Sequence, residues 1–314
     1  MSLLIVEKLS KTYRGAQGDV QAVADVSFSI ADGEVLGVVG ESGCGKSTLG
    51  RSILKLIEPS AGRVRFAGRD ITGLSRRDMK PVRRDVQIVF QDQFGSLNPR
   101  HKVGTIIGEP LVVHAIGNAA DRRARVAELL RLVGLPEDAA KRFPHEFSGG
   151  QRQRIAIARA LALEPKLLVA DEAVSALDVS IQSQIINLIA ELRKRLGLAI
   201  LFISHDLSVI RHVSDRIAVM YLGRIVEIGP AAEIMQAPRH PYTQALLSAI
   251  PRPGEKRERQ VLKGELPDPA HPPAGCPFHT RCPKVMDICK SARPDLLPPQ
   301  AVAGGSEVAC HLYS

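Results

Sequence analysis

Aromatic residues are scarce in this chain, at 4% of its 314 positions, although the hydrophobic fraction is an ordinary 45%. No window approaches the roughly 18 uncharged apolar residues that a membrane-spanning helix needs, so we expect no spanning helix. Residues 1–7 form too short an apolar run and lack a small-residue cleavage site, so we expect no signal peptide. No repeat of solenoid length is visible. These absences predict a globular cytosolic protein.

The balance of charge is basic, with a formal net charge of +9. Paired arginines at 76–77, 83–84 and 122–123 would suit a nucleic acid or an anionic membrane surface. A solvated face of mixed charge is the alternative, and we favour it over a dedicated polyanion site. The length exceeds that of a usual single core, which predicts one large domain and one small appendage.

Residues 40–48 read GESGCGKST, which fits the phosphate-binding pattern G-x-x-x-x-G-K-[ST]. The motif lies between an apolar run at 35–39 and a segment at 48–57 with apolar residues at helical spacing, so it joins a strand to a helix. Backbone N–H groups at such a junction bind phosphates, Lys46 reaches the β and γ oxygens, and the Ser47 hydroxyl takes a place on Mg²⁺.

A second glycine turn, Ser148–Gln151, opens a predicted helix that ends before Pro165. Its helix N-terminus is another anion site, and because one nucleotide needs only one wrapping loop, we expect it to bind the ATP of another subunit. A simple N-cap turn would look the same. The run LLVADE at 167–172 is an apolar strand that ends on Asp171 and Glu172, which suits Mg²⁺ binding by the first and polarisation of the attacking water by the second.

Polar residues follow two further apolar runs, Gln91 after 86–90 and His205 after 199–204. Either residue could sense the γ-phosphate, and the alternative for each is an ordinary loop residue. Tyr13 precedes the first long strand region, where it would either stack on the base of a nucleotide or pack in the core.

The predicted fold class is α/β, with an N-terminal antiparallel β region that includes an alternating strand at 26–30 and a turn at Asp32 and Gly33. The runs at 167–170 and 199–203 fit buried parallel strands. Between Gln91 and Pro165 the apolar residues follow a helical spacing, which predicts a helical subdomain inserted at about 92–165. Within it Asp121 is predicted to cap a helix that Gly134 and Pro136 end.

These motifs, in this order, resemble those of ATP-binding cassette (ABC) ATPases over roughly residues 3–250. The resemblance implies a head-to-tail dimer that holds ATP between Lys46 of one subunit and the Ser148 turn of the other. It also implies Glu172 as the catalytic carboxylate, His205 as the switch histidine, Gln91 as the Mg²⁺ and coupling residue and Asp178, in SALD at 175–178, as a dimer contact. The nucleotide-binding residues implied are Tyr13, Gly40, Ser42, Gly43, Cys44, Gly45, Lys46, Ser47, Thr48, Ser148, Gly149, Gly150, Gln151 and Asp178, and those for Mg²⁺ are Ser47, Gln91 and Asp171.

A narrower resemblance rests on FQDQFGSLNPR at 90–100, PHEFSGGQRQR at 144–154 and HPYTQAL at 240–246. These segments are similar to the ATPase subunits of dipeptide and oligopeptide importers, in the F-type form of the usual ATPase pair. The chain departs from that family at Ala173, where a proline is normal, and loss of a fixed φ would loosen Glu172.

The C-terminal part has a composition of its own. Residues 251–275 are rich in proline and predict a semi-rigid linker between a cassette at 1–250 and a small module at 276–314. The module carries Cys276, Cys282, Cys289 and Cys310, and four thiols in a reducing cytosol favour zinc or an iron–sulfur cluster over disulfides, with simple packing as the alternative. The spacings are not the C-x-x-C of most zinc modules. GCPFHTRCP at 275–283 and VACH at 308–311 resemble the importers' C-terminal extension, which in some members holds a [4Fe–4S] cluster, and we expect that cluster here.

The expected function is therefore ATP hydrolysis that drives peptide import at the cytoplasmic face of the inner membrane. The partners implied are a paralogous ATPase, two membrane permease subunits and, indirectly, an extracytoplasmic solute-binding protein, with no nucleic acid expected. Two alternatives stay open. One is import of nickel or another solute by the same machinery, and the other is a soluble ABC ATPase that acts on the ribosome or on DNA.

Overall fold

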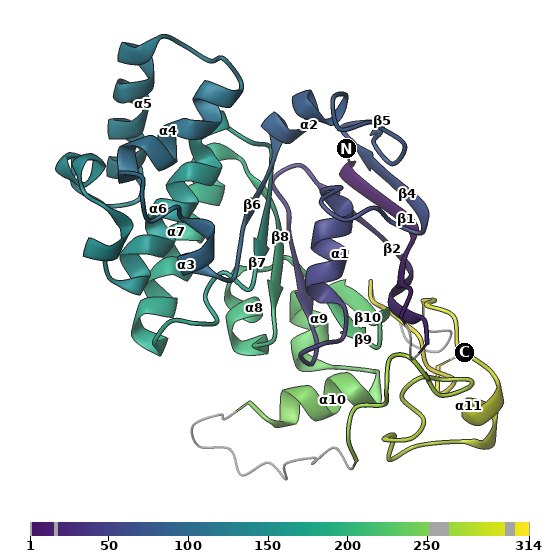
Figure 1. Cartoon of the computed structure of the whole chain (residues 1–314). Coiled ribbons are helices and arrows are strands. Elements are labelled where there is room, and N and C mark those ends of the chain that lie inside the picture. Colours follow the sequence, from purple (N-terminus) through teal and green to yellow (C-terminus); the bar gives the residue numbers. More distant parts are fainter. Residues whose placement is uncertain (1, 16–17, 251–263, 299–304, 314) are drawn as a thin grey trace. The chain divides into compact units, whose positions relative to one another are not determined.

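The structure is a computed structural model that describes residues 2–15, 18–250, 264–298 and 305–313 (Figure 1), without the side chains of 93 and 94. Most of the predicted linker, residues 251–263, lies outside the described residues. The described chain forms two compact units. The first unit contains residues 31–34 and 73–202, and the second contains residues 2–30, 35–72 and 203–314.

The second unit contains an antiparallel sheet whose strands lie in the order β2-β1-β4-β5. Leu4 pairs with Phe66 and Val6 with Val64, and all four side chains are buried, as the period of two of a half-covered sheet requires. This confirms the predicted antiparallel β region. The strands are β1 (Ser2–Tyr13), β2 (Val20–Ala31), β4 (Ala61–Phe66) and β5 (Arg69–Asp70).

The second unit also contains four neighbouring strands in the order β11-β10-β9-β3. Strand β3 (Val35–Val39) is buried at every position and runs parallel to β9 (Arg216–Tyr221). Strand β10 (Arg224–Pro230) pairs antiparallel with β9 and with the short β11 (Glu307–Val308), so the last part of the chain covers the edge of β10. The helices of this unit are α1 (Lys46–Ile53), α8 (Leu207–Val213), α9 (Ala231–Gln236), α10 (Pro241–Ser248) and α11 (Asp287–Ser291).

The first unit contains the strands β8-β7-β6 as neighbours, in that order. Val86 to Val89 of β6 pair in parallel with Leu167 to Ala170 of β7. Every residue of β7 and β8 is buried, as predicted for both strands, and β7 runs parallel to β6. The strands are β6 (Val86–Val89), β7 (Leu167–Asp171) and β8 (Ala199–Ser204), whose last two residues fall in the second unit.

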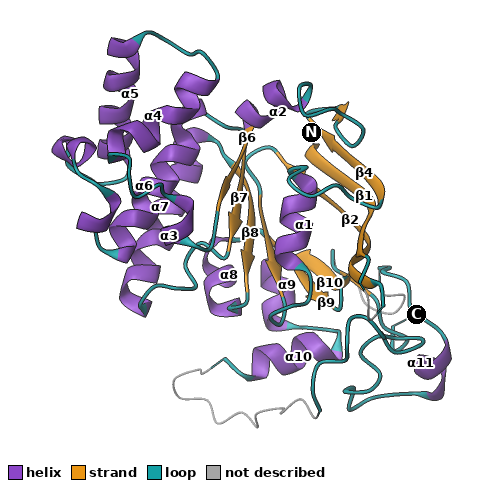
Figure 2. Cartoon of the chain, viewed as in Figure 1, coloured by secondary structure: helices purple, strands orange, loops and turns teal. Residues whose placement is uncertain are grey.

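The chain between β6 and β7 is helical, and Figure 2 shows α4, α5 and α6 gathered with no strand among them. The predicted cap of α5 is wrong by three residues, because Asn118 is the N-cap and Asp121 completes its capping box from the third helical position. No helix among the described residues is long and apolar enough to cross a bilayer. The helices of this unit are α2 (Met79–Asp85), α3 (Gln93–Ser96), α4 (Val103–Val113), α5 (Ala119–Leu132), α6 (Gly149–Ala160) and α7 (Val179–Leu196).

Candidate functional site

The phosphate loop wraps the N-terminus of α1 in the second unit. Lys46 is only 3% exposed, and its Nζ donates to the carbonyl oxygens of Gly40 at 2.8 Å and Glu41 at 2.9 Å. Gly45 has φ +103°, and a Cβ there would lie 1.9 Å from the carbonyl oxygen of Ala22. Only glycine fits that position, so the sequence motif is built here as a tight turn whose N–H groups lie at the positive end of a helix.

The rest of the loop divides into a packed part and an accessible part. Cys44 is buried, its Sγ lies 3.9 Å from Lys46 Nζ, and burial raises the pKa of its thiol, so Cys44 packs the loop in its protonated form. Ser42 and Gly43 are exposed, whereas Ser47 and Thr48 are half-buried. The accessible residues are those that a bound phosphate chain would approach.

Glu41 makes contacts that the sequence reasoning missed. Its carboxylate accepts from Arg281 and its N–H donates to the hydroxyl of Tyr242. The sequence offers one indication of these contacts, because a carboxylate within an anion-binding loop is expected to have a nearby cation.

Gln91 and Glu172 are brought together in the first unit, 81 positions apart in sequence. Gln91 Nε2 donates to Glu172 Oε2 at 3.1 Å. Asp171, the last residue of β7, is 1% exposed, whereas Glu172 is half-buried, so the two carboxylates lie in different surroundings. Glu172 has φ +49°, a conformation that costs a non-glycine residue of order 1–3 kcal/mol and that concentrates at functional sites.

The backbone around Glu172 is held by its own turn. The Ser175 hydroxyl donates to the Glu172 carbonyl at 3.0 Å, and the Ser175 N–H donates to the same oxygen at 3.2 Å. Ala173, at the position where a proline is normal in the similar importers, is 1% exposed. Packing and these two hydrogen bonds restrain the turn where a proline ring is missing.

The Ser148 turn, residues 148–151, begins α6 with a complete capping box. The Ser148 hydroxyl accepts from the Gln151 N–H, and the Gln151 side chain accepts from the Ser148 N–H at 3.0 Å. A Cβ on Gly150 would lie 2.5 Å from Cγ2 of Ile181 in α7, so the turn packs against the start of that helix. Asp178 at the N-terminus of α7 is exposed, and Val179 is 79% exposed. The turn and Asp178 therefore lie close together, beside an apolar side chain open to solvent.

Two further predicted residues lie in the second unit with the phosphate loop. His205 follows β8 with an exposed side chain, just before Asp206, which caps α8 by accepting from the Ser208 N–H. Tyr13 ends β1 and is 40% exposed, and Lys11 Nζ lies 5.1 Å from the centroid of its ring. An exposed ring of this kind is open to stacking on a base and does not belong to the core.

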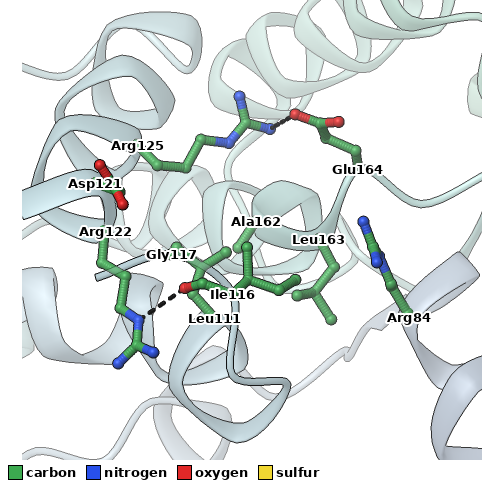
Figure 3. A pocket seen from close by; sticks show the side chains of 10 residues that line it. All are labelled: Arg84, Leu111, Ile116, Gly117, Asp121, Arg122, Arg125, Ala162, Leu163 and Glu164. Carbon is green, nitrogen blue, oxygen red and sulfur yellow. Dashed lines mark hydrogen bonds and ion pairs between the residues drawn. The ribbon is translucent and has the colours of Figure 1, made fainter. Parts of the chain in front are cut away.

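A pocket of about 200 Å³ lies in the first unit, at α4, α5 and the turn after α6. Its floor is apolar, with Leu111, Ile116 and Leu163, and arginines surround it (Figure 3). Arg125 pairs with Glu164 at 3.2 Å. Since none of the predicted catalytic or nucleotide-binding residues lines it, this pocket does not carry the expected chemistry.

The predicted [4Fe–4S] cluster is wrong, and so is the zinc alternative. Within the described ranges, no three histidine, cysteine or acidic side chains come together as the ligands of a metal ion. Cys276 and Cys289 are buried, whereas Cys282 and Cys310 are half-buried. Burial raises the pKa of Cys276 to about 11 and also raises the pKa values of Cys282 and Cys310.

Comparisons with known proteins match the fold and two separate segments of the chain. The model of the ABC transporter family matches residues 23–175, and the model of the oligopeptide/dipeptide transporter C-terminal region matches residues 226–289. A dimeric ATP-binding cassette, MJ0796, solved in a post-hydrolysis state with ADP and Pi, superposes with a TM-score of 0.67 at 31% identity, over 73% of this chain and 98% of that one. The fold is that of an ABC ATPase.

Curated relatives extend over nearly the full length. The oligopeptide transport ATP-binding protein AppF of Bacillus subtilis is 56% identical over 95% of this chain and 91% of its own. A putative peptide import ATP-binding protein of Brucella ovis is 53% identical over 94% of this chain and 93% of its own. The chain belongs to the ABC transporter family, within the group that carries the oligopeptide/dipeptide C-terminal region.

Proposed function

We propose that this chain is the ATP-hydrolysing subunit of an ABC importer that powers uptake of dipeptides or oligopeptides through separate membrane permeases. The observation that carries the ATPase part is the preformed phosphate loop, with Lys46 buried and Gly45 in a conformation that only glycine fits. The peptide part is supported by the match of residues 226–289 and by the names of the relatives.

Each residue's proposed role follows from its chemistry and from the resemblance to ABC ATPases. The loop N–H groups and Lys46 bind the phosphates, Tyr13 stacks on the base, and Ser42 to Thr48 line the path of the phosphate chain. Hydroxyl, amide and carboxylate oxygens are the donors that Mg²⁺ prefers, so Ser47, Gln91 and Asp171 fit as its ligands. Bound Mg²⁺ supplies neutralisation of the phosphate charge.

Glu172 then acts on the water that attacks the γ-phosphate. Its half-buried carboxylate accepts from Gln91 Nε2, which orients the group that polarises the water. His205 contacts the γ-phosphate and reports its presence. Cleavage removes the γ-phosphate that His205 contacts. The helices after Gln91 pass the resulting conformational change to a permease.

A second cassette completes the site in this proposal. The Ser148 turn is a helix N-terminus, and Asp178 and Val179 are exposed beside it. An exposed valine next to an anion-binding turn suits contact with the nucleotide and loop of another subunit. We propose a paralogue as this mate, two permease subunits as the membrane partners and the cytoplasmic face of the membrane as the location.

Co-purification tests the transport function. A tagged chain would be extracted with native membranes in mild detergent, and its companions identified by mass spectrometry. Recovery of two multi-span permeases with a second cassette ATPase supports the importer, and the attached solute-binding protein then shows whether the solute is a peptide, nickel or another compound. Recovery with ribosomal proteins or DNA, and without permeases, would overturn it.

A further inference from the structure

Arg281, from the C-terminal module, makes an ion pair with the phosphate loop. Its Nη1 lies 2.9 Å from Oε2 and 3.1 Å from Oε1 of Glu41. The side chain of Arg281 is 8% exposed and that of Glu41 is 26% exposed, so the pair is largely shielded from solvent. The same Glu41 donates its N–H to the Tyr242 hydroxyl at 2.9 Å, which ties the loop backbone to α10.

The two partners of Glu41 are held in place by buried aromatic packing. Tyr221, Tyr242 and Phe278 are each at most 1% exposed. Their ring centroids lie 4.8 Å apart for Tyr221 and Tyr242, 5.2 Å for Tyr221 and Phe278, and 5.5 Å for Tyr242 and Phe278. Phe278 is three residues from Arg281, so the cluster fixes the segment that presents the guanidinium. Both residues that contact Glu41 therefore belong to or adjoin this buried cluster, since the Arg281 guanidinium carbon lies 6.0 Å from the Tyr221 ring centroid.

These contacts act on the nucleotide for two physical reasons. The carbonyl oxygen of Glu41 accepts from Lys46 Nζ, so the position of Glu41 helps to place the lysine that reaches the phosphates. The carboxylate of Glu41 would also repel a bound polyphosphate, and a shielded cation at 2.9 Å offsets that repulsion. Without the cation, the loop would carry an uncompensated negative charge next to its ligand.

We propose that Arg281 is a positioning residue for nucleotide binding, through which the C-terminal module sets the affinity of the phosphate loop for ATP. This inference rests on the proposed ATPase function. Because coupling between two sites is reciprocal, a bound nucleotide also stabilises the contact of Arg281 with the loop.

Calorimetric titration of the full chain with Mg-ATP tests the proposal. Arg281→Gln should raise the dissociation constant about tenfold, the range expected for a hydrogen-bonded charge. Arg281→Lys should recover most of the affinity, because a single guanidinium nitrogen makes both contacts and an ammonium can replace it. Lys290→Gln is the matched control, since it removes a cation of the same module that pairs with Asp287 at 2.9 Å and should leave binding unchanged.

A double-mutant cycle with Glu41→Gln separates positioning from general structure. Arg281→Gln should cost little in the Glu41→Gln background, because the charge to be offset is already gone. The proposal is overturned if Arg281→Gln lowers the unfolding midpoint but leaves the dissociation constant as in the parent, or if Lys290→Gln weakens binding equally. Failure of the parent chain to bind Mg-ATP would instead reject the ATPase function itself.

Discussion

The amide of Gln91 donates a hydrogen bond of 3.1 Å to the carboxylate of Glu172. Gln91 follows β6 and Glu172 follows β7, and these strands are parallel neighbours, so their carboxyl ends meet at one edge. Glu172 occupies a left-handed backbone conformation there. A carboxylate that is held on one side by an amide and strained in its backbone has the character of a residue placed for chemistry.

Replacing Glu172 by glutamine should abolish turnover while ATP still binds. The amide keeps the shape but loses the negative charge that polarises water, so the ATPase rate should fall by about 10²–10⁴-fold. Phosphate release measures the rate, and size-exclusion chromatography with ATP should show a stable dimer with the mate subunit. Glu191→Gln, on an exposed position of α7, is the control. A variant at Glu172 that hydrolyses near the parent rate means that another group is the base.

Removing the amide of Gln91 should have a smaller effect. Gln91→Ala deletes the donor to Glu172, which we expect to lower the ATPase rate about tenfold at saturating Mg-ATP, a condition under which weaker Mg²⁺ binding does not contribute. Gln91→Ala added to Glu172→Gln should cost almost nothing more, because the two residues act as a unit. Independent, multiplicative losses in the double variant would show that the observed contact is not used.

A bulky charge in the Ser148 turn should block assembly of the shared site. Ser148→Arg removes the cap of α6 and fills the exposed approach to the turn, so ATP-dependent association should be lost while a single subunit still binds ATP. Light scattering with and without Mg-ATP checks this. Dimers that persist at parental affinity would indicate that ATP is not held against the turn.

Truncation of Phe278 should destabilise the second unit. The ring is 1% exposed, so Phe278→Ala should lower the free energy of unfolding by about 3–5 kcal/mol, as urea denaturation measures it. Leu312→Ala, at a side chain 40% exposed in the same module, should change it by less than about 1 kcal/mol. Equal losses for both variants would contradict the packing described here.

His240 should make the fold sensitive to acid. Burial lowers its pKa from 6.5 to about 3, so below pH 6.5 the unfolded chain takes up a proton that the folded chain excludes. The contribution to the free energy of unfolding therefore falls by about 1.4 kcal/mol per pH unit between pH 6.5 and 3. Burial raises the pKa of Glu227, which acts in the opposite direction, so the test is the difference between the parent and His240→Asn. Parallel pH profiles would show that His240 does not titrate in this way.

The elements with a local signal could be predicted from the sequence. A segment of about ten residues is enough to predict the phosphate loop, the parallel strands and the glycine turn that opens α6. The signals are glycines, apolar runs and a serine cap. The resemblance to ABC ATPases implied roles for Gln91 and Glu172, and the structure shows a hydrogen bond between these two side chains. What these motifs have in common is that their physical cause is short-range.

Longer-range features could not be read in this way. Arg281 stands among cysteines, prolines and a histidine, and nothing nearby indicates that its partner lies in the phosphate loop. The predicted [4Fe–4S] cluster was wrong for the same reason, because the spacing of cysteines along the chain does not determine how their thiols are arranged in space. The N-cap of α5 was also predicted three residues too late. Asn118 and Asp121 are both good capping residues, and the backbone conformation shows that Asn118 is the N-cap.

The contact between Glu41 and Arg281 spans 240 positions of sequence. Translation proceeds at about 5–20 residues per second, so roughly 10–50 s separate the synthesis of the two partners. During that interval the nascent loop is present without the cation and the aromatic cluster that hold it. The phosphate loop is thus made well before the residues that hold Glu41, and its affinity for ATP should rise once Arg281 has been added.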